Sequence, residues 1–551
     1  MSNLLDKASI ILTPTAYNNG EALCVKPSDG SGDFDFSRNS AATRVNAQGL
    51  VENVQSLGSE LVTNGDFSNG SANWNLGASW SIVNEKAVNN GASNSFLTQN
   101  SIIENGKSYL VSFEISDMTQ GSLQLRFGSG AIVTESFTTN GTKTSYYVSS
   151  GTAINFYSVS GFDGSIDNVS VKEVIDNTNL PRINYEGFSY DGSGNIIPNS
   201  GCGSWLFESQ STNLITQSEL FSGGSWGNYN STTTDNQTTA PDGLLTASKF
   251  SGTSDVTAHT LYLNAYPVVS GNDYTYSVFA KKNESNFIQI NTGQGFGNLY
   301  ANFDLDNGVV GSFNTLDADI EPYLNGWFKC SVKANSSTAT GQSTFSLIQS
   351  LTDLRNPSFN ALNNSVYIWG AQLEQQSYAT SYIPTNGSSV TRNQDVCNNG
   401  ATGTGLINST EGTLYFEGAT LSNENVQRWI ALSDGTHNNT IKLGFLNSAT
   451  EYKIAFDVRV GGVNQAFLPY NFGTVAPTFK KFAVKYKQND FALWIDGVEV
   501  ATDTSGNTPI GLSELAFDRG DGGQDFFGKT KALAVWKEAL TDQELTELTT
   551  I

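Results

Sequence analysis

Alternation of apolar and polar residues is the feature that most constrains the fold of this chain. Between residues 109 and 127, apolar side chains stand at every second position: Tyr109, Val111, Phe113, Ile115, then Leu123, Leu125 and Phe127. A period of two places such side chains on one face of an extended strand. The chain also contains 54 Gly and only 15% charged residues, which is typical of short strands joined by tight turns. We therefore expect an all-β fold of tandem antiparallel β-sandwich (jelly-roll) domains with a small split N-terminal β module.

Length and turn signals subdivide the chain. A chain of 551 residues is too long for one hydrophobic core and suggests about three to four domains. The turn at 46–49, Asp306-Asn307-Gly308 and Asp496-Gly497 predict hairpins. Thr541 and Glu544 form a capping-box pattern, which predicts a short helix near the C-terminus.

Charge and composition exclude several classes of partner. The net charge is -23 and no cluster of Lys or Arg occurs, so neither duplex nucleic acid nor a strongly acidic polysaccharide is expected to bind. Neutral sugars remain suitable, because aromatic rings and Asn, Gln and Asp side chains hold them. No run approaches the roughly 18 apolar residues that span a membrane, so no membrane insertion is expected. The four cysteines, Cys24, Cys202, Cys330 and Cys397, are too scattered for a zinc site and are expected to be reduced thiols.

Several segments resemble bacteriophage structural proteins. GAQLE at 370–374, SYATSYIPT at 377–385 and VTR at 390–392 resemble a signature of phage tail and fibre proteins, where it follows a carbohydrate-binding-type β-sandwich. FDFSRNSAATRVNAQGLVENV, residues 34–54, resembles the leader of many phage structural proteins. In that family the leader runs almost directly into segments like LPRINY at 180–185 and WLFE at 205–208, but about 120 residues separate them here.

That separation predicts an inserted domain, since insertion is tolerated where the ends of a domain lie close together. ELVTNGDF at 60–67 resembles the start of carbohydrate-binding sandwiches, and GSIDNVSV at 164–171 resembles their last strand. The C-terminal residues 527–545 resemble the last strand and short helix of laminin-G or concanavalin-type jelly rolls. The predicted organisation has an N-terminal module in two halves (1–57 and 176–204), the inserted sandwich (58–175), a second carbohydrate-binding-like sandwich (205–396) and a jelly roll (397–551).

Candidate binding residues are aromatic side chains outside the alternating strands. Aromatic rings in polar, Gly- and Asn-rich surroundings can stack on sugar rings, although packing in a core is the competing interpretation. The candidates are Trp74, Trp80, Trp226, Tyr229 and Trp429.

Candidate metal ligands lie in acidic, Gly-rich loops. Asp518, Asp521 and Asp525 could supply oxygen atoms to a calcium ion, and Asp66 could share an ion with Asp167. The alternative is an ordinary exposed turn, which is rich in the same residues.

Catalysis is not expected. The Glu-x-Asp-x-x-Glu pattern of retaining lectin-like glycosidases is absent, which leaves only isolated acids that would have to converge in space. These acids are Glu208, Glu374, Glu417 and Asp457.

The resemblance implies a non-enzymatic virion protein, a fibre or tail-associated adhesin. In this hypothesis the N-terminal module binds other virion proteins, and the sandwiches bind a glycan of the host surface. A homo-oligomer is expected, and a trimer is taken only from fibre proteins in general, because no heptad run marks a coiled coil. The protein would be assembled in the host cytoplasm, since residues 1–17 lack the pattern of a signal peptide. The alternatives are a polysaccharide depolymerase and a purely structural decoration protein without a ligand.

Overall fold

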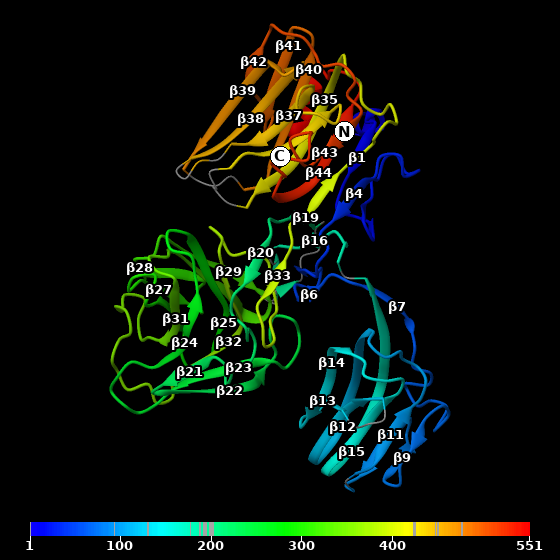
Figure 1. Cartoon of the computed structure of the whole chain (residues 1–551), viewed down its shortest axis with the longest axis vertical. Coiled ribbons are helices and arrows are strands. Elements are labelled where there is room, and N and C mark those ends of the chain that lie inside the picture. The colour runs from blue at the N-terminus through cyan, green and yellow to red at the C-terminus, as the bar shows by residue number, and fades with distance from the viewer. Residues whose placement is uncertain are drawn as a thin grey trace. The chain divides into compact units, whose positions relative to one another are not determined.

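The computed structural model describes residues 2–550 except 93, 129–131, 177, 187–188, 191–195, 198–202, 422–425, 447, 449–450 and 475–477. Strands dominate it throughout, and the predicted all-β fold is confirmed (Figure 1). The chain forms two compact units, one of residues 55–177 and a larger one of residues 1–54 together with 178–551.

The smaller unit is a β-sandwich, and we call it the inserted sandwich. Its strands are β7 (Ser56–Glu60), β8 (Asn75–Leu76), β9 (Trp80–Val83), β10 (Lys86–Asn90), β11 (Phe96–Gln99), β12 (Ser108–Phe127), β13 (Ile132–Phe137), β14 (Gly141–Val148) and β15 (Ile154–Asp176). β12 and β15 pair along most of their length and carry the other strands at their sides. The alternating residues that predicted half-buried strands, such as Val111 and Leu125, are fully buried in its core.

The two long strands change register near their middles. The pairing of β12 with β15 shifts between Ser116 and Ser122, so that β14 and β10 pair with one half of the two strands and β13 and β11 with the other half. Gly121 lies at this point with φ +78°, and a Cβ atom there would come within 2.3 Å of the Phe162 backbone nitrogen. Glycine is therefore required at this crossing.

The ends of the inserted sandwich are neighbours. Ser56 on β7 pairs with Asp176 on β15, so the chain enters and leaves at one place. The predicted insertion, 58–175, lies within this unit. In the larger unit, Val54 donates to Ala42 and Ser40 donates to Thr178, which anchors both flanks of the insertion to the same segment.

The larger unit contains a two-sheet sandwich, the middle sandwich. One sheet has β21 (Trp226–Tyr229), β24 (Thr260–Pro267), β31 (Thr340–Leu347), β26 (Phe287–Thr292), β27 (Tyr300–Asp304) and β28 (Val309–Phe313) in spatial order. The other has β22 (Ser231–Thr238), β23 (Ala247–Gly252), β32 (Ser365–Glu374), β25 (Asp273–Lys282), β30 (Trp327–Asn335) and β29 (Asp317–Tyr323). A 3-10 turn, η1 (Leu324–Gly326), joins β29 to β30.

The C-terminal sandwich of this unit also has two sheets. The first has β16 (Ile183–Asn184), β19 (Ser204–Phe207), β44 (Gly528–Trp536), β35 (Glu411–Thr420), β40 (Lys480–Lys487), β41 (Asp490–Ile495) and β42 (Val498–Asp503), with β1 (Ile10–Leu12) on β44. The second has β39 (Val463–Gly473), β38 (Tyr452–Val460), β37 (Thr440–Phe445), β36 (Arg428–Ser433) and β43 (Glu514–Ala516).

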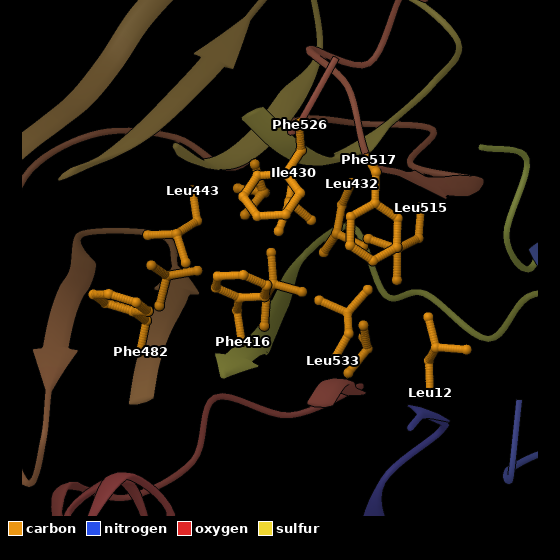
Figure 2. Close-up of a cluster of buried hydrophobic side chains, with 14 of the residues drawn as sticks. Leu12, Phe416, Ile430, Leu432, Leu443, Phe482, Leu515, Phe517, Phe526 and Leu533 are labelled. Carbon is orange, nitrogen blue, oxygen red and sulfur yellow. The ribbon is translucent and has the colours of Figure 1, made fainter. Parts of the chain in front are cut away.

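N-terminal segments thus complete the C-terminal sandwich. Leu12 pairs with Leu533 in the strand register, and Trp205 of β19 pairs with Thr530. Figure 2 shows Leu12 in the same apolar cluster as Phe416, and both side chains are fully buried. The N-terminal segments therefore share a core with the jelly roll that follows hundreds of residues later.

Short elements connect these layers. They are β2 (Tyr17–Asn18), β3 (Glu21–Ala22), β4 (Phe34–Ser37), β5 (Thr43–Val45), β6 (Val51–Asn53), β17 (Ser189–Tyr190), β18 (Ile196–Ile197), β20 (Ser211–Asn213), β33 (Val390–Arg392), β34 (Val396–Asn398) and α1 (Ser2–Lys7). The three predicted hairpin turns join β5 to β6, β27 to β28 and β41 to β42. The capping box of Thr541 and Glu544 begins α2 (Asp542–Thr549), as predicted.

The sequence also led to expectations for the cysteines and for membrane-spanning segments. Cys24, Cys330 and Cys397 are free, buried thiols, while Cys202 lies outside the described residues. No helix in the described part of the chain has the length and apolar character needed to cross a membrane.

Candidate functional site

Four of the five candidate aromatic residues are buried: Trp74, Trp80 and Trp226 lie in hydrophobic cores, and Trp429 lies beneath the Lys442 ammonium. Trp74, Trp80, Trp226 and Trp429 are only 3–7% exposed, whereas Tyr229 is 53% exposed. The buried indoles donate to carbonyl oxygens of Asn64, Ser95 and Gln217 and to the Gln524 side chain. Other segments of the chain cover these four rings, so they offer no free face to a sugar.

The predicted calcium ligands are held by their own loops. Asp521 pairs with Arg519 at 2.7 Å, and Asp518 is buried and accepts from the Gly520 backbone. Burial, with the nearby Asp518 carboxylate, raises the pKa of Asp525 to about 6. In the described residues, no group of three or more His, Cys, Asp or Glu side chains lies in an arrangement that could hold a metal ion.

The residues of the second predicted ion site make local hydrogen bonds. Asp66 Oδ1 accepts from Ser68, and Asp167 Oδ1 accepts from the backbone of Asn168. An ion shared by the two carboxylates stays a prediction.

The phage-like segments meet in one buried ion network of the larger unit. Arg182 binds Glu208 at 2.6 Å and also pairs with Asp395, and their side chains are 0–3% exposed. Arg38 joins from the leader segment and binds Asp395 at 3.2 Å. Arg392 of the VTR segment completes the network by pairing with Glu208. The buried ion network comprises these five residues.

Hydrogen bonds fix the network further. Ser381, from the SYATSYIPT segment, donates backbone and hydroxyl hydrogens to Glu208 at 2.8 and 2.6 Å. Although burial alone would raise the pKa of Glu208, Arg392 and Arg182 hold it well below its usual range. The signature residues therefore act together as a structural clamp between distant segments.

The isolated acids considered for catalysis are engaged in structural contacts. Glu374 accepts from Ser211 and Gln372 at 2.6 Å and also from Thr380. Asp457 pairs with the buried Lys442 at 2.8 Å. Glu417 accepts from the Tyr415 hydroxyl. Because these acids are saturated or dispersed, they do not form the pair of carboxylates that glycoside hydrolysis requires.

A groove of about 520 Å³ lies in the inserted sandwich. We call it the amide groove. It is lined by Asn75, Leu76, Gly77, Ala78, Ser79, Asn90, Ala92, Asn94, Ser95, Phe96 and Thr98, none of which is charged. Asn75, Asn90 and Asn94 are exposed, and Phe96 is half-buried. Trp80 lies behind this lining and bonds the Ser95 carbonyl, so it supports the groove from within.

An aromatic pair adjoins the amide groove. The rings of Phe96 and Tyr157 face each other across β11 and β15 with centroids 4.4 Å apart. The Tyr157 hydroxyl donates to Asn94 at 2.6 Å, and the Arg126 guanidinium lies 3.8 Å from the Tyr157 ring centroid. Sequence reasoning missed these residues, because it used the alternation in the long strands only to find the core face.

A second pocket, of about 460 Å³, lies in the larger unit, and we call it the junction pocket. Its lining includes the turn at 43–51, residues 184–186, strands β29 and β30, and the segment 377–382. Tyr452 and Lys529 reach it from the C-terminal sandwich. No sequence motif indicated it, because it exists only where these separate segments meet.

Comparison with known proteins gives only distant likenesses. No family model matches the sequence, and no curated protein matches it. Among solved structures, a CBM40 module of the Ruminococcus gnavus IT-sialidase is 18% identical, with 26% of this chain and 84% of that chain covered and a TM-score of 0.22. A CBM22 tandem domain from Paenibacillus barcinonensis is 11% identical, with 59% and 99% covered and a TM-score of 0.20. At TM-scores this low, these likenesses assign no site to this chain.

Proposed function

We propose that this protein is a non-catalytic, glycan-binding component of a phage virion, and that the amide groove binds a neutral saccharide of the host surface. The observation that carries the proposal is the lining of this groove. Exposed amide groups of Asn75 and Asn90 stand beside the half-buried ring of Phe96, without a charge among the lining residues.

This lining suits a neutral sugar in chemical terms. An amide both donates and accepts hydrogen bonds, as each sugar hydroxyl does. An aromatic ring packs against the apolar face of a sugar ring. An acidic sugar would find no counter-ion in the lining, and the net charge of -23 would repel it.

The virion assignment is supported by the phage-like segments. Four of their charged residues, Arg38, Arg182, Glu208 and Arg392, build the buried ion network together with Asp395, which gives a structural reason for the resemblance. In this proposal the N-terminal segments contact other virion proteins, and several copies, as in a trimer, act together on the host surface. Many weak sites can raise overall avidity by about 100-fold or more.

The test is binding of the purified full chain to panels of neutral and acidic oligosaccharides. We expect binding of neutral members, with affinity lowered about 10-fold by a combined Asn75→Ala and Asn90→Ala change, since each removes about 0.5–1.5 kcal/mol of hydrogen bonding. Asn100→Ala is the matched control, because Asn100 is exposed in the same unit but does not line the groove.

Three results would contradict the proposal. They are binding of acidic sugars alone, binding unaffected by the double variant, and no sugar binding at all. Release of reducing ends from a host polysaccharide would indicate the depolymerase alternative instead.

A further inference from the structure

We infer that the junction pocket is a second binding site, which holds the end of a saccharide chain without acidic groups. The inference rests on the proposed function only for the class of ligand. The site itself is independent, since the junction pocket lies in the larger unit and the amide groove in the inserted sandwich.

One wall of the junction pocket is an edge strand with regularly spaced acceptors. Asp317, Asp319 and Glu321 alternate along β29, so their side chains share one face of the strand and line the pocket. Asp317, Asp319 and Glu321 are exposed to solvent there. Carboxylates offer two oxygens each, which can accept from neighbouring sugar hydroxyls.

The nearby ammonium groups are committed to other partners. Lys333 pairs with Asp273 at 2.8 Å, and Lys329 is buried and donates to the Thr380 carbonyl at 2.5 Å. Lys529 pairs with Glu186 at 2.6 Å. Glu321 interacts with the charges of Lys529 and Lys329, whereas Asp317 and Asp319 remain available to hydroxyl donors, and a carboxylated sugar would meet like charge there.

Tyrosine side chains supply the flat apolar surfaces. Tyr185, Tyr323, Tyr378 and Tyr452 come from four separate segments, and all four are half-buried in the lining. The Tyr323 hydroxyl bonds Glu321, which orients that carboxylate. Rings beside hydrogen-bonding groups are the combination that recognises a sugar.

The size of the pocket supports a chain end. Its volume of about 460 Å³ lies in the range of small-ligand sites and suits one or two sugar rings. The lining comes from three parts of the larger unit, which surround the space with turns and strand faces. The amide groove, in contrast, is lined by two short stretches of the inserted sandwich, 75–79 and 90–98.

The experiment is titration calorimetry on the full chain with methyl glucoside, methyl galactoside and N-acetylglucosamine, and with glucuronic acid as the acidic comparison. We expect at least one neutral sugar to bind and glucuronic acid not to bind. Asp319→Asn and Tyr452→Ala should each lower the affinity about 10-fold, since each removes contacts worth about 1–1.5 kcal/mol. Asp255→Asn, an exposed acid outside the lining, is the control.

The amide-groove double variant separates this inference from the proposed function. Loss of binding in the pocket variants but not in the groove variant supports the junction pocket. Loss in the groove variant alone overturns the junction pocket and leaves the proposed function standing. Stronger binding of glucuronic acid than of the neutral sugars, or no binding of any sugar, overturns the inference.

Discussion

The inserted sandwich and the buried ion network of the larger unit are stabilised in different ways. In the inserted sandwich, aromatic rings such as Phe113 and Phe156 pack with centroids 4.8 Å apart, and the Lys107–Glu173 ion pair is 39% and 30% exposed. In the larger unit, Arg182 and Glu208 are almost inaccessible to water. A continuous stretch can close its own apolar core, whereas the distant segments of the larger unit are joined by directional ionic contacts in addition to a shared apolar core.

The largest expected effect comes from breaking the buried ion network. Arg182→Ala leaves Glu208 and Asp395 buried without their shared cation, so we expect a loss of about 3–5 kcal/mol in the free energy of unfolding. Denaturant unfolding monitored by hydrogen exchange would measure this loss of stability, which should be confined to the larger unit.

The matched control is Lys107→Ala in the inserted sandwich. This change removes an exposed, solvent-screened ion pair, so little or no loss of stability is expected. Equal losses of stability in the two variants would show that a buried ion pair contributes no more to stability than an exposed one in this protein.

A smaller effect on the free energy of unfolding is expected from Glu219 and Asp242, two acids of the larger unit whose pKa values are not lowered by a cation. Burial, with the nearby Asp242, raises the pKa of Glu219 to about 7, and burial raises the pKa of Asp242 to about 6. The folded state therefore binds protons more tightly than the unfolded chain. The resulting stabilisation is complete below the unfolded pKa of Glu219, near 4.5, and is lost as the pH rises through 7.

Glu219→Gln should remove part of this pH dependence. We expect the larger unit to gain about 1–2 kcal/mol at pH 8 relative to the unmodified chain, and little at pH 5. Unfolding curves at both pH values would measure the difference. A gain of the same size at both values would show that titration of Glu219 is not its cause.

The smallest effect is expected from removing the inserted sandwich. Its ends pair at Ser56 and Asp176, so a short Gly-Ser linker in place of 55–177 should change the stability of the larger unit by less than about 0.5 kcal/mol. Residues 55–177 alone should unfold in one cooperative transition. Failure of either part to fold would show that the two regions stabilise each other.

The fold could be predicted largely from the sequence, because its signals are local. Alternation around Val111 and Leu125, the turn at Asp306-Asn307-Gly308 and the capping box of Thr541 each depend on a few neighbouring residues. The pairing of Leu12 with Leu533 has no local signal, and it places the N-terminal segments in the jelly-roll sheet.

The candidate site was harder to predict for the same reason. Trp80 and Trp226 stand in polar stretches, yet carbonyl groups of nearby loop residues satisfy their indoles and leave them buried. Asn75 and Asn90 carry no signal in an Asn-rich chain, and they line one groove only after the loops have folded. Whether such residues line a groove depends on how the chain folds, and composition does not reveal it.

Because β1 pairs with β44, the larger unit cannot be completed until its C-terminal strands have been synthesised. The partners of β1 lie more than 500 positions later, so the contact order of this sheet is very high, and such pairings form slowly. The inserted sandwich contains all of its own strand partners and can fold on the ribosome while its host is still incomplete. Translation that stops before residue 528 leaves β1 and β19 without β44, and unpaired strands of this kind promote aggregation.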